Sequence, residues 1–502
     1  MLFGNKAMKR IISGSAKIKY TALSLSLALL LAAQGCAFAD MPGISAGEHP
    51  SEETGVETVE EGASPIIVID SPAKETEPKE PEAEEAPVEE PEVRDFDNRF
   101  FTMKAKDPDE VTLSFVGDIN FCDDYANMRV LRDEEGENLA GCVLPEVTDV
   151  MKSADIMMAN NEFAYSDRGS PTPNKQYTFR AKPEHITKLH EMGIDIVSLA
   201  NNHAYDWGPD ALMDTFALLR DNDVPYVGAG ENLTEAMKPV YFKVNGRTLS
   251  YVSATQIERT PNPDTREATE TDPGVLRTLD PSRFVEVIRE AEANSDFVIV
   301  YVHWGSESTD LVEASQRELA EKYADAGADL IIGDHSHCLQ GIDYVKGVPV
   351  FYSLGNFWFN SKTLDTCIIT VTVETSAPAE TADPETEIPG FAETLPIRSL
   401  KFVPCIQKSC RTRLADETES ARIYAYLQGI CDHAAVDENG IITYSEENRN
   451  TQGGVNTFPG RKKAEPEGAE ALPPVPDGAE TAAPPAEGVP EAAPAGDEAP
   501  RE

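Results

Sequence analysis

The chain has 502 residues, which is enough for two or three domains of ordinary size. Its 88 Asp and Glu residues outnumber its 43 Lys and Arg residues and give a formal net charge of −45. A charge of this sign repels nucleic acids and anionic lipid surfaces, so it argues against DNA or RNA as a partner.

The first 39 residues have the pattern of an export signal peptide. Lysines and an arginine precede an apolar stretch at residues 21–33, which is too short for a comfortable membrane span. Residues 37–39, Ala-Phe-Ala, fit a signal-peptidase site, whereas Cys36 offers a lipoprotein junction behind a poor lipobox. Retention as an uncleaved anchor is a third alternative. Each route predicts an exported protein that is free, at the cell surface, or lipid-anchored through Cys36.

Two long segments have the composition of disordered chain. Residues 40–106 and 453–502 are rich in Glu, Pro and Ala and have few apolar side chains to offset the entropy of ordering. Residues 377–387 repeat this composition and predict an insertion inside the folded part. The expected organisation is therefore an acidic linker, one folded domain at residues 107–452, and an acidic tail.

The cysteines give no metal-binding or redox motif. They stand at positions 36, 122, 142, 338, 367, 405, 410 and 431, without a CxxC pair. Export makes disulfides permissible, and Cys122 with Cys142 or Cys405 with Cys410 are candidate pairs.

Short apolar runs alternate with helical periodicity between the linker and the tail. Strands are predicted at residues 111–117, 155–160, 195–200, 296–302, 329–333 and 349–355. Helices are predicted at residues 182–193, 209–222, 281–294 and 313–327. Residues 400–407 and 440–445 also look like strands. This alternation predicts an α/β domain.

Polar residues follow most of these apolar runs. The first run ends in Gly-Asp-Ile-Asn, the second in Asn-Asn-Glu and the third in Asn-Asn-His. The fourth continues into His-Trp-Gly-Ser-Glu and the fifth into Gly-Asp-His-Ser-His. Ligands bind at the carboxyl ends of strands in open α/β folds, so we expect these residues to meet in one crevice.

The histidines sharpen this prediction, because four of the eight lie at strand ends: His203, His303, His335 and His337. His335 and His337 reach one site only if the chain turns after its strand, since they share a face in an extended strand. Neutral imidazole, carboxylate and amide oxygen together suit Zn²⁺, Mn²⁺ or Fe. The sequence therefore predicts a metal site.

The motifs that carry these residues resemble a known family. The strings SFVGDINF, MMANNEFAYS, GIDIVSLANNHAYDWG, VHWGSE and GADLIIGDHSH…GVPVFYSLGNFWF occur in this order within residues 111–362. They resemble the capsule-synthesis protein CapA family, which is similar to calcineurin-like metallophosphatases. The resemblance implies a four-layer α/β/β/α sandwich and a centre of two divalent metal ions.

Site residues are carried over from this resemblance position by position. The implied metal ligands are Asp118, Glu162, Asn202, His303, His335 and His337. The implied catalytic groups are His203, which acts on the leaving group, and Asp334, which with Glu307 would orient imidazoles. Asn161, Asn201 and Glu307 are the expected substrate-binding residues. Asn120 departs from the Asp-x-His pattern of metallophosphatases, and an Arg often found beyond the first Asp is absent.

Three functions follow from the resemblance and the ligand set. The first is a role in synthesis, export or attachment of a capsular polymer such as poly-γ-glutamate, beside membrane subunits. The second is a free-standing metal-dependent hydrolase of phosphoesters or γ-glutamyl amides in the envelope. The third is a polymer-binding scaffold without turnover. A polyanionic polymer and an acidic protein repel each other unless metals or a local basic patch intervene.

Overall fold

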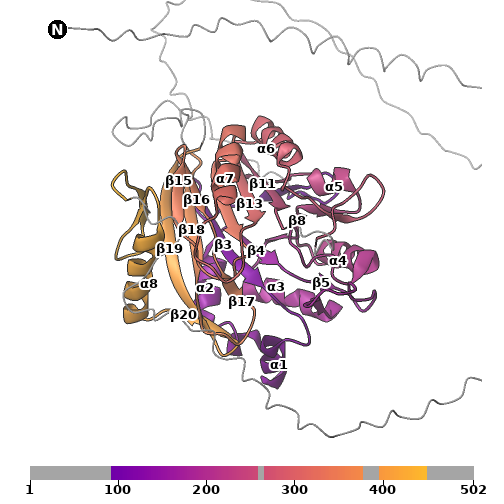
Figure 1. Ribbon diagram of the computed structural model, residues 1–502. Helices are drawn as coiled ribbons and strands as arrows, with labels where there is room; N and C mark the ends of the chain where they lie inside the picture. Colours follow the sequence, from indigo (N-terminus) through magenta and orange to yellow (C-terminus); the bar gives the residue numbers. More distant parts are fainter. Residues whose placement is uncertain (1–91, 258–264, 377–394, 449–502) are drawn as a thin grey trace, which may run out of the picture. The chain divides into compact units, whose positions relative to one another are not determined.

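The computed structural model describes residues 92–257, 265–376 and 395–448 (Figure 1). The expected signal peptide, Cys36, most of the acidic linker, the insertion at 377–387 and the acidic tail lie outside these ranges. Within them, no helix combines the length and the apolar character needed to cross a membrane.

The described residues form a mixed α/β fold around two large sheets. The first has eight strands in the order β1-β2-β10-β11-β13-β14-β16-β15 within these residues. These strands are β1 (Arg94–Asp95), β2 (Phe100–Met103), β10 (Val240–Val244), β11 (Arg247–Thr255), β13 (Phe297–His303), β14 (Leu330–Asp334), β15 (Ile342–Val345) and β16 (Val348–Phe351). Its centre is parallel, because β11 pairs with β13, β13 with β14, and β14 with β16 in the same direction.

The second sheet follows the order β20-β19-β18-β3-β4-β7-β8, with β17 also paired to β3, across the described residues. These strands are β3 (Glu110–Ile119), β4 (Ile156–Asn161), β7 (Ile196–Ser198), β8 (Tyr226–Val227), β17 (Asn356–Trp358), β18 (Leu364–Glu374), β19 (Ile397–Lys408) and β20 (Arg411–Leu414). Strands β3, β4, β7 and β8 are parallel, whereas β18 runs antiparallel to β3. Strand pairs β5 (Ala164–Tyr165) with β6 (Arg180–Ala181), β9 (Ala229–Gly230) with β12 (Gly274–Val275), and β21 (Ala434–Val436) with β22 (Ile442–Tyr444) complete the strands.

The helices connect and cover the sheets. They are α1 (Ala126–Asp133), α2 (Pro145–Ser153), α3 (Thr187–Met192), α4 (Gly208–Asp221), α5 (Leu233–Met237), α6 (Ser282–Asn294), α7 (Ala314–Ala326) and α8 (Glu417–Ile430), with short 3₁₀ turns at η1 (Leu139–Gly141) and η2 (Pro183–Ile186). Helix α7 begins at a capping box of Glu313 and Gln316 and ends at Gly327 in the left-handed conformation. The helix at 182–193 is divided into η2 and α3, and Gly193 ends it.

Alternate residues of each central strand pack into different apolar clusters. In β13, Phe297, Ile299 and Tyr301 join side chains of both sheets, while Val298 and Val300 pack with α6 and α7. Helices α6 and α7 lie side by side against this face (Figure 1). The other face of the second sheet packs with α2, α3 and α4. This period of two is what a strand buried on both faces requires.

The structure confirms the six main predicted strands as β3, β4, β7, β13, β14 and β16, and the two further ones as β19 and β22. Strands β1 and β2 are a correction to the expected linker, because β2 pairs with β10 before residue 107. The candidate disulfides are also corrected: Cys122, Cys142, Cys405 and Cys410 are all buried thiols without a disulfide partner.

Candidate metal centre

The carboxyl ends of parallel strands from both sheets meet at one place. Asp118 lies at the end of β3, Glu162 directly follows β4, and Asn202 follows β7, all in the second sheet. His303 ends β13, and His335 and His337 follow β14 in the first sheet. Three overlapping groups of possible ligands form there among the described residues, and in each group the ligand atoms lie within 4.8 Å of one another. The groups are Glu162, His303 and His335; Asp118, Glu162 and His337; and Asp118, His303 and Asp334.

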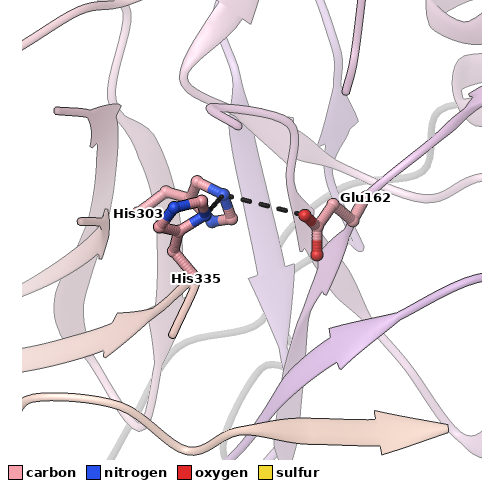
Figure 2. A group of neighbouring side chains, drawn as sticks. All are labelled: Glu162, His303 and His335. Atoms are coloured by element: carbon pink, nitrogen blue, oxygen red, sulfur yellow. Dashed lines mark hydrogen bonds and ion pairs between the residues drawn. The ribbon is translucent and has the colours of Figure 1, made fainter. Parts of the chain in front are cut away.

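His303 stands at the centre of the cluster. Its Nδ1 is 2.8 Å from Asp334 Oδ1, while its Nε2 is 2.8 Å from Asn202 Oδ1 and 2.9 Å from His335 Nδ1. Figure 2 shows the two rings and the carboxylate of Glu162 beyond them. Burial lowers the pKa of His303 to about 3, so the ring is neutral. A proton on Nδ1 facing Asp334 leaves a lone pair on Nε2, which meets the amide oxygen of Asn202, itself an acceptor, as expected where a cation binds between them.

Asp118 is the second centre of contacts. Its Oδ1 accepts a hydrogen bond from Asn160 Nδ2 at 2.9 Å, and its Oδ2 lies 3.2 Å from His337 Nδ1. Asn356 Oδ1 is 2.8 Å from the same ring nitrogen. Burial raises the pKa of Asp118, but the hydrogen bond and the charge of His337, with a hydrogen bond from Asn160, outweigh it and lower the pKa to about 2. Asp118 is therefore ionised.

Glu162 gives the test of whether these residues fit a metal ion. It is fully buried, and neither of its carboxylate oxygens has a hydrogen-bond partner. The nearest ring nitrogens are His303 Nε2 at 3.8 Å and His203 Nε2 at 3.9 Å. Burial and the charges of Asp118 and Asp334 raise the pKa of Glu162 well above its usual value. A bound divalent cation would satisfy both oxygens, so the donor set fits.

His203 belongs to a separate buried chain of contacts beside this cluster. Its Nδ1 lies 2.6 Å from Asp206 Oδ2, and its ring stacks on Phe179 with centroids 4.0 Å apart. Asp206 Oδ1 is 2.6 Å from Lys175 Nζ, which also donates to the backbone carbonyl of Asn202. Burial lowers the pKa of His203, although the charge of Asp206 opposes this. Nε2 of His203 is thereby directed towards Glu162.

Unusual backbone angles bring the last two histidines into the site. His335 has φ 87° and His337 has φ 56°, both in the left-handed region that non-glycine residues rarely adopt. The turn predicted for this pair is therefore present. Gly117 allows a second close approach, because a Cβ there would lie 2.0 Å from Gly355 O. This approach brings β17, with Asn356, beside Asp118.

The structure brings together all six residues predicted as ligands, and also Asp334 and His203. The residues predicted to bind substrate differ in how far they are buried. Asn161 and Asn201 are buried, and Asn201 Nδ2 donates to Asn160 Oδ1 and to Asn161 O. Glu307 is exposed, and its charge acts on Glu162 and His337. Their substrate contacts stay predictions.

Sequence reasoning missed three residues of this region, Lys175, Asp206 and Asn356; it expected Asn160 in the crevice but gave it no role of its own. Asp206 lies three residues after His203, and a turn there brings both side chains inward. Asn356 lies in the SLGNFWF string but had no assigned role. A single lysine in a polar loop gives no signal in sequence, so Lys175 was not identifiable.

Comparisons with known proteins agree on one family. The model of the family described as bacterial capsule synthesis protein PGA_cap matches residues 112–361, which include every residue of the cluster. The PGA biosynthesis protein CapA of Bacillus subtilis (strain 168) is 32% identical over 273 residues, which cover 53% of this chain and 69% of that protein. The capsule biosynthesis protein CapA of Bacillus anthracis is 31% identical over 280 residues, which cover 53% of this chain and 65% of that protein. A probable polyglutamine synthesis accessory protein of Mycobacterium tuberculosis (strain ATCC 25618 / H37Rv) is 27% identical over 211 residues, covering 41% of this chain and 55% of that protein.

Proposed function

The chain belongs to the family of bacterial capsule synthesis proteins, and we propose that it acts on a capsular polymer of the poly-γ-glutamate type through a divalent-metal centre. The metal centre is proposed mainly because of Glu162. Its carboxylate is buried, neither oxygen has a hydrogen-bond partner, and it lies beside the rings of His303 and His203. The proposed ligands are Asp118, Glu162, Asn202, His303, His335 and His337.

A divalent ion in this position supplies charge stabilisation for a phosphoryl or carbonyl oxygen when it is bound. The protein's own residues would do the rest. Asp334 holds His303 through Nδ1, which leaves Nε2 as the ligand atom. Asp206 accepts the Nδ1 proton of His203, which leaves the Nε2 lone pair facing the site; Nε2 would first take up a proton there and then pass it to a leaving group. Asn160 and Asn356 fix Asp118 and His337 from outside.

We also propose the number and kind of metal ions, the layering of the fold and the location of the protein. Two ions of Mn, Zn or Fe would match the overlapping ligand groups, of which one contains His335 and another His337. The apolar clusters on both faces of each sheet support a four-layer α/β/β/α sandwich. An exported protein at the cell surface, lipid-anchored through Cys36 or released, would work beside membrane subunits of capsule synthesis.

A free-standing envelope hydrolase of phosphoesters or γ-glutamyl amides is the second candidate. The contact of His203 with Asp206 favours it over a scaffold, because it orients a buried imidazole that a passive binding protein does not need. This preference concerns catalysis only. The family places the chain in capsule synthesis in either case.

The deciding experiment measures metal content in the full-length purified protein. His335→Ala/His337→Ala should lose the metal that the wild type holds near stoichiometrically, whereas His190→Ala, outside the cluster, should keep it. The same samples are then tested for chelator-reversible hydrolysis of a generic phosphodiester and of poly-γ-glutamate. Turnover of one substrate establishes the hydrolase and its class. Metal without turnover favours the scaffold, and a folded wild type without metal rejects the centre.

A further inference from the structure

Arginine side chains in the described residues commonly pair with a carboxylate, as an excess of acidic residues predicts. Ion pairs of this kind involve Arg94, Arg132, Arg168, Arg220, Arg283, Arg317, Arg398, Arg411, Arg413 and Arg422. Arg180 and Arg266 differ from them, because each lies over an aromatic ring and has no carboxylate partner among the described residues.

Both rings belong to the turn that begins with His203. The guanidinium carbon of Arg180 lies 3.6 Å from the centroid of the Trp207 ring, and that of Arg266 lies 5.7 Å from the centroid of the Tyr205 ring. Asp206, between these two aromatic residues, is buried against His203. The inward side of the turn therefore orients the candidate acid, while the outward side carries two cations.

Stacking leaves the useful part of each guanidinium group available. A guanidinium group over a ring is held by its charge and its flat face, and its N–H groups lie along the edge of its plane; Arg180 is in close contact with its ring and Arg266 is further from its own. Arg180 uses Nη1 to donate to Arg168 O at 3.0 Å, and Arg266 has no hydrogen bond from its side chain within the described chain. An edge of this kind matches a carboxylate, which accepts two parallel N–H bonds.

The other cations near the turn already have partners. Lys175 is buried against Asp206, and Arg168 pairs with Asp214 and Asp210. Acidic groups are also close, since Asp272 and Asp210 act on the Tyr205 hydroxyl. Arg180 and Arg266 are therefore the local attraction for an anion in surroundings that otherwise repel it.

We propose that Arg180 and Arg266 form a binding site for carboxylates spaced along an acidic polymer chain, on the outer side of the turn that carries His203. The proposal rests on the proposed function and names the residues by which an acidic protein overcomes its repulsion of a polyanion. Two guanidinium groups, lying over rings two residues apart in one turn, would hold the chain while its backbone passes His203.

The test compares Arg180→Gln/Arg266→Gln with Arg398→Gln/Arg422→Gln in the full-length protein. The second pair removes the same charge from two arginines that have carboxylate partners and lie on β19 and α8. Binding of fluorescein-labelled poly-γ-glutamate is followed by anisotropy at low and moderate salt. The first pair should weaken binding about tenfold or more and flatten its salt dependence, and the control pair should bind like the wild type.

Two further measurements make the outcome specific. Trp304 and Trp358 are fully buried, so a change of tryptophan fluorescence on polymer addition should come from Trp207 and vanish in Trp207→Phe. Polyphosphate of equal charge should compete poorly, and preferential binding of polyphosphate would overturn the carboxylate assignment.

Failure of the arginine site can be distinguished from failure of the proposed function. Equal binding by the wild type and Arg180→Gln/Arg266→Gln rejects the arginine site and leaves the proposed function standing. A wild type that binds no poly-γ-glutamate, with or without metal, rejects action on that polymer and this site with it.

Discussion

Nδ1 of His203 lies 2.6 Å from Oδ2 of Asp206, three residues further along the same turn. The same carboxylate forms an ion pair with the buried ammonium of Lys175 and accepts a hydrogen bond from the backbone N–H of Phe179. One aspartate thus orients an imidazole, neutralises a lysine and fixes a strand end.

Asp206→Asn should therefore destabilise the protein strongly. It leaves Lys175 as a buried charge without its counterion, and breaking such a pair costs about 3–5 kcal/mol. Urea unfolding at neutral pH measures the loss. Asp223→Asn, which removes the partner of Arg94 in a solvent-accessible pair, is the control and should cost less than about 1 kcal/mol. An equal loss of unfolding free energy in the two variants would mean that the buried ion pair stabilises the protein no more than the solvent-accessible one.

Glu162→Gln should separate metal binding from stability. The metal-free variant should be at least as stable as the metal-free wild type, because it no longer buries an unpaired carboxylate. Added metal at 100 times its dissociation constant should stabilise the wild type by about 2.7 kcal/mol and the variant very little. Unfolding with EDTA and with Mn²⁺ or Zn²⁺ measures both. The idea fails if metal stabilises the two proteins equally.

Asp195 should give the fold a pH dependence outside the site. Burial raises its pKa to about 6, although its Oδ2 accepts a hydrogen bond from Met157 N at 2.8 Å. The folded state binds this proton more tightly than the unfolded state, whose value is 3.8. The resulting stabilisation is complete below pH 3.8 and is lost as the pH rises to about 6.

Asp195→Asn removes this titration but keeps an acceptor for Met157 N. The variant should therefore gain about 2–3 kcal/mol relative to the wild type between pH 4 and pH 8. Urea unfolding of both proteins across this range provides the comparison. Parallel curves would show that Asp195 titrates equally in the folded and unfolded chains.

Gly117→Ala should disturb the approach of β17 to β3. Its methyl group would meet Gly355 O at 2.0 Å, so backbone must move, at a cost of about 3 kcal/mol. Metal affinity should fall with stability, because Asp118 and Asn356 lie on the two strands that separate. Gly136→Ala is the control: it has φ 69° but no atom within 4 Å, so it should cost about 1 kcal/mol and leave metal binding intact.

Much of the fold was predictable where strands are apolar on both faces. Runs such as residues 296–302 are bounded by polar residues and stand out without any knowledge of their partners. Strands β10 and β11 were missed, although Asn245-Gly246 is a strong hairpin signal between them. Helix α8 was missed as well, because it buries only Ile423, Leu427 and Ile430 within 14 residues.

The residues of the site also divide into those that the sequence could predict and those that it could not. Its histidines and acids follow apolar runs, so their convergence could be inferred from the direction of parallel strands. Lys175 and Asn356 join the site only through contacts with residues distant in the sequence, so their sequence neighbours do not indicate a role for them. The place of Arg180 and Arg266 depends likewise on rings that belong to another segment.

Asp118 and His337 approach within 3.2 Å although 219 residues separate them in the chain. Closing so long a loop costs chain entropy, which the pairing of the strands that carry both residues must offset. A chain still unfolded therefore offers an ion only scattered, weak ligands. A metal ion bound at the proposed centre would therefore be chosen where folding is completed, so the supply of metals in that compartment, together with intrinsic affinity, would decide the occupant.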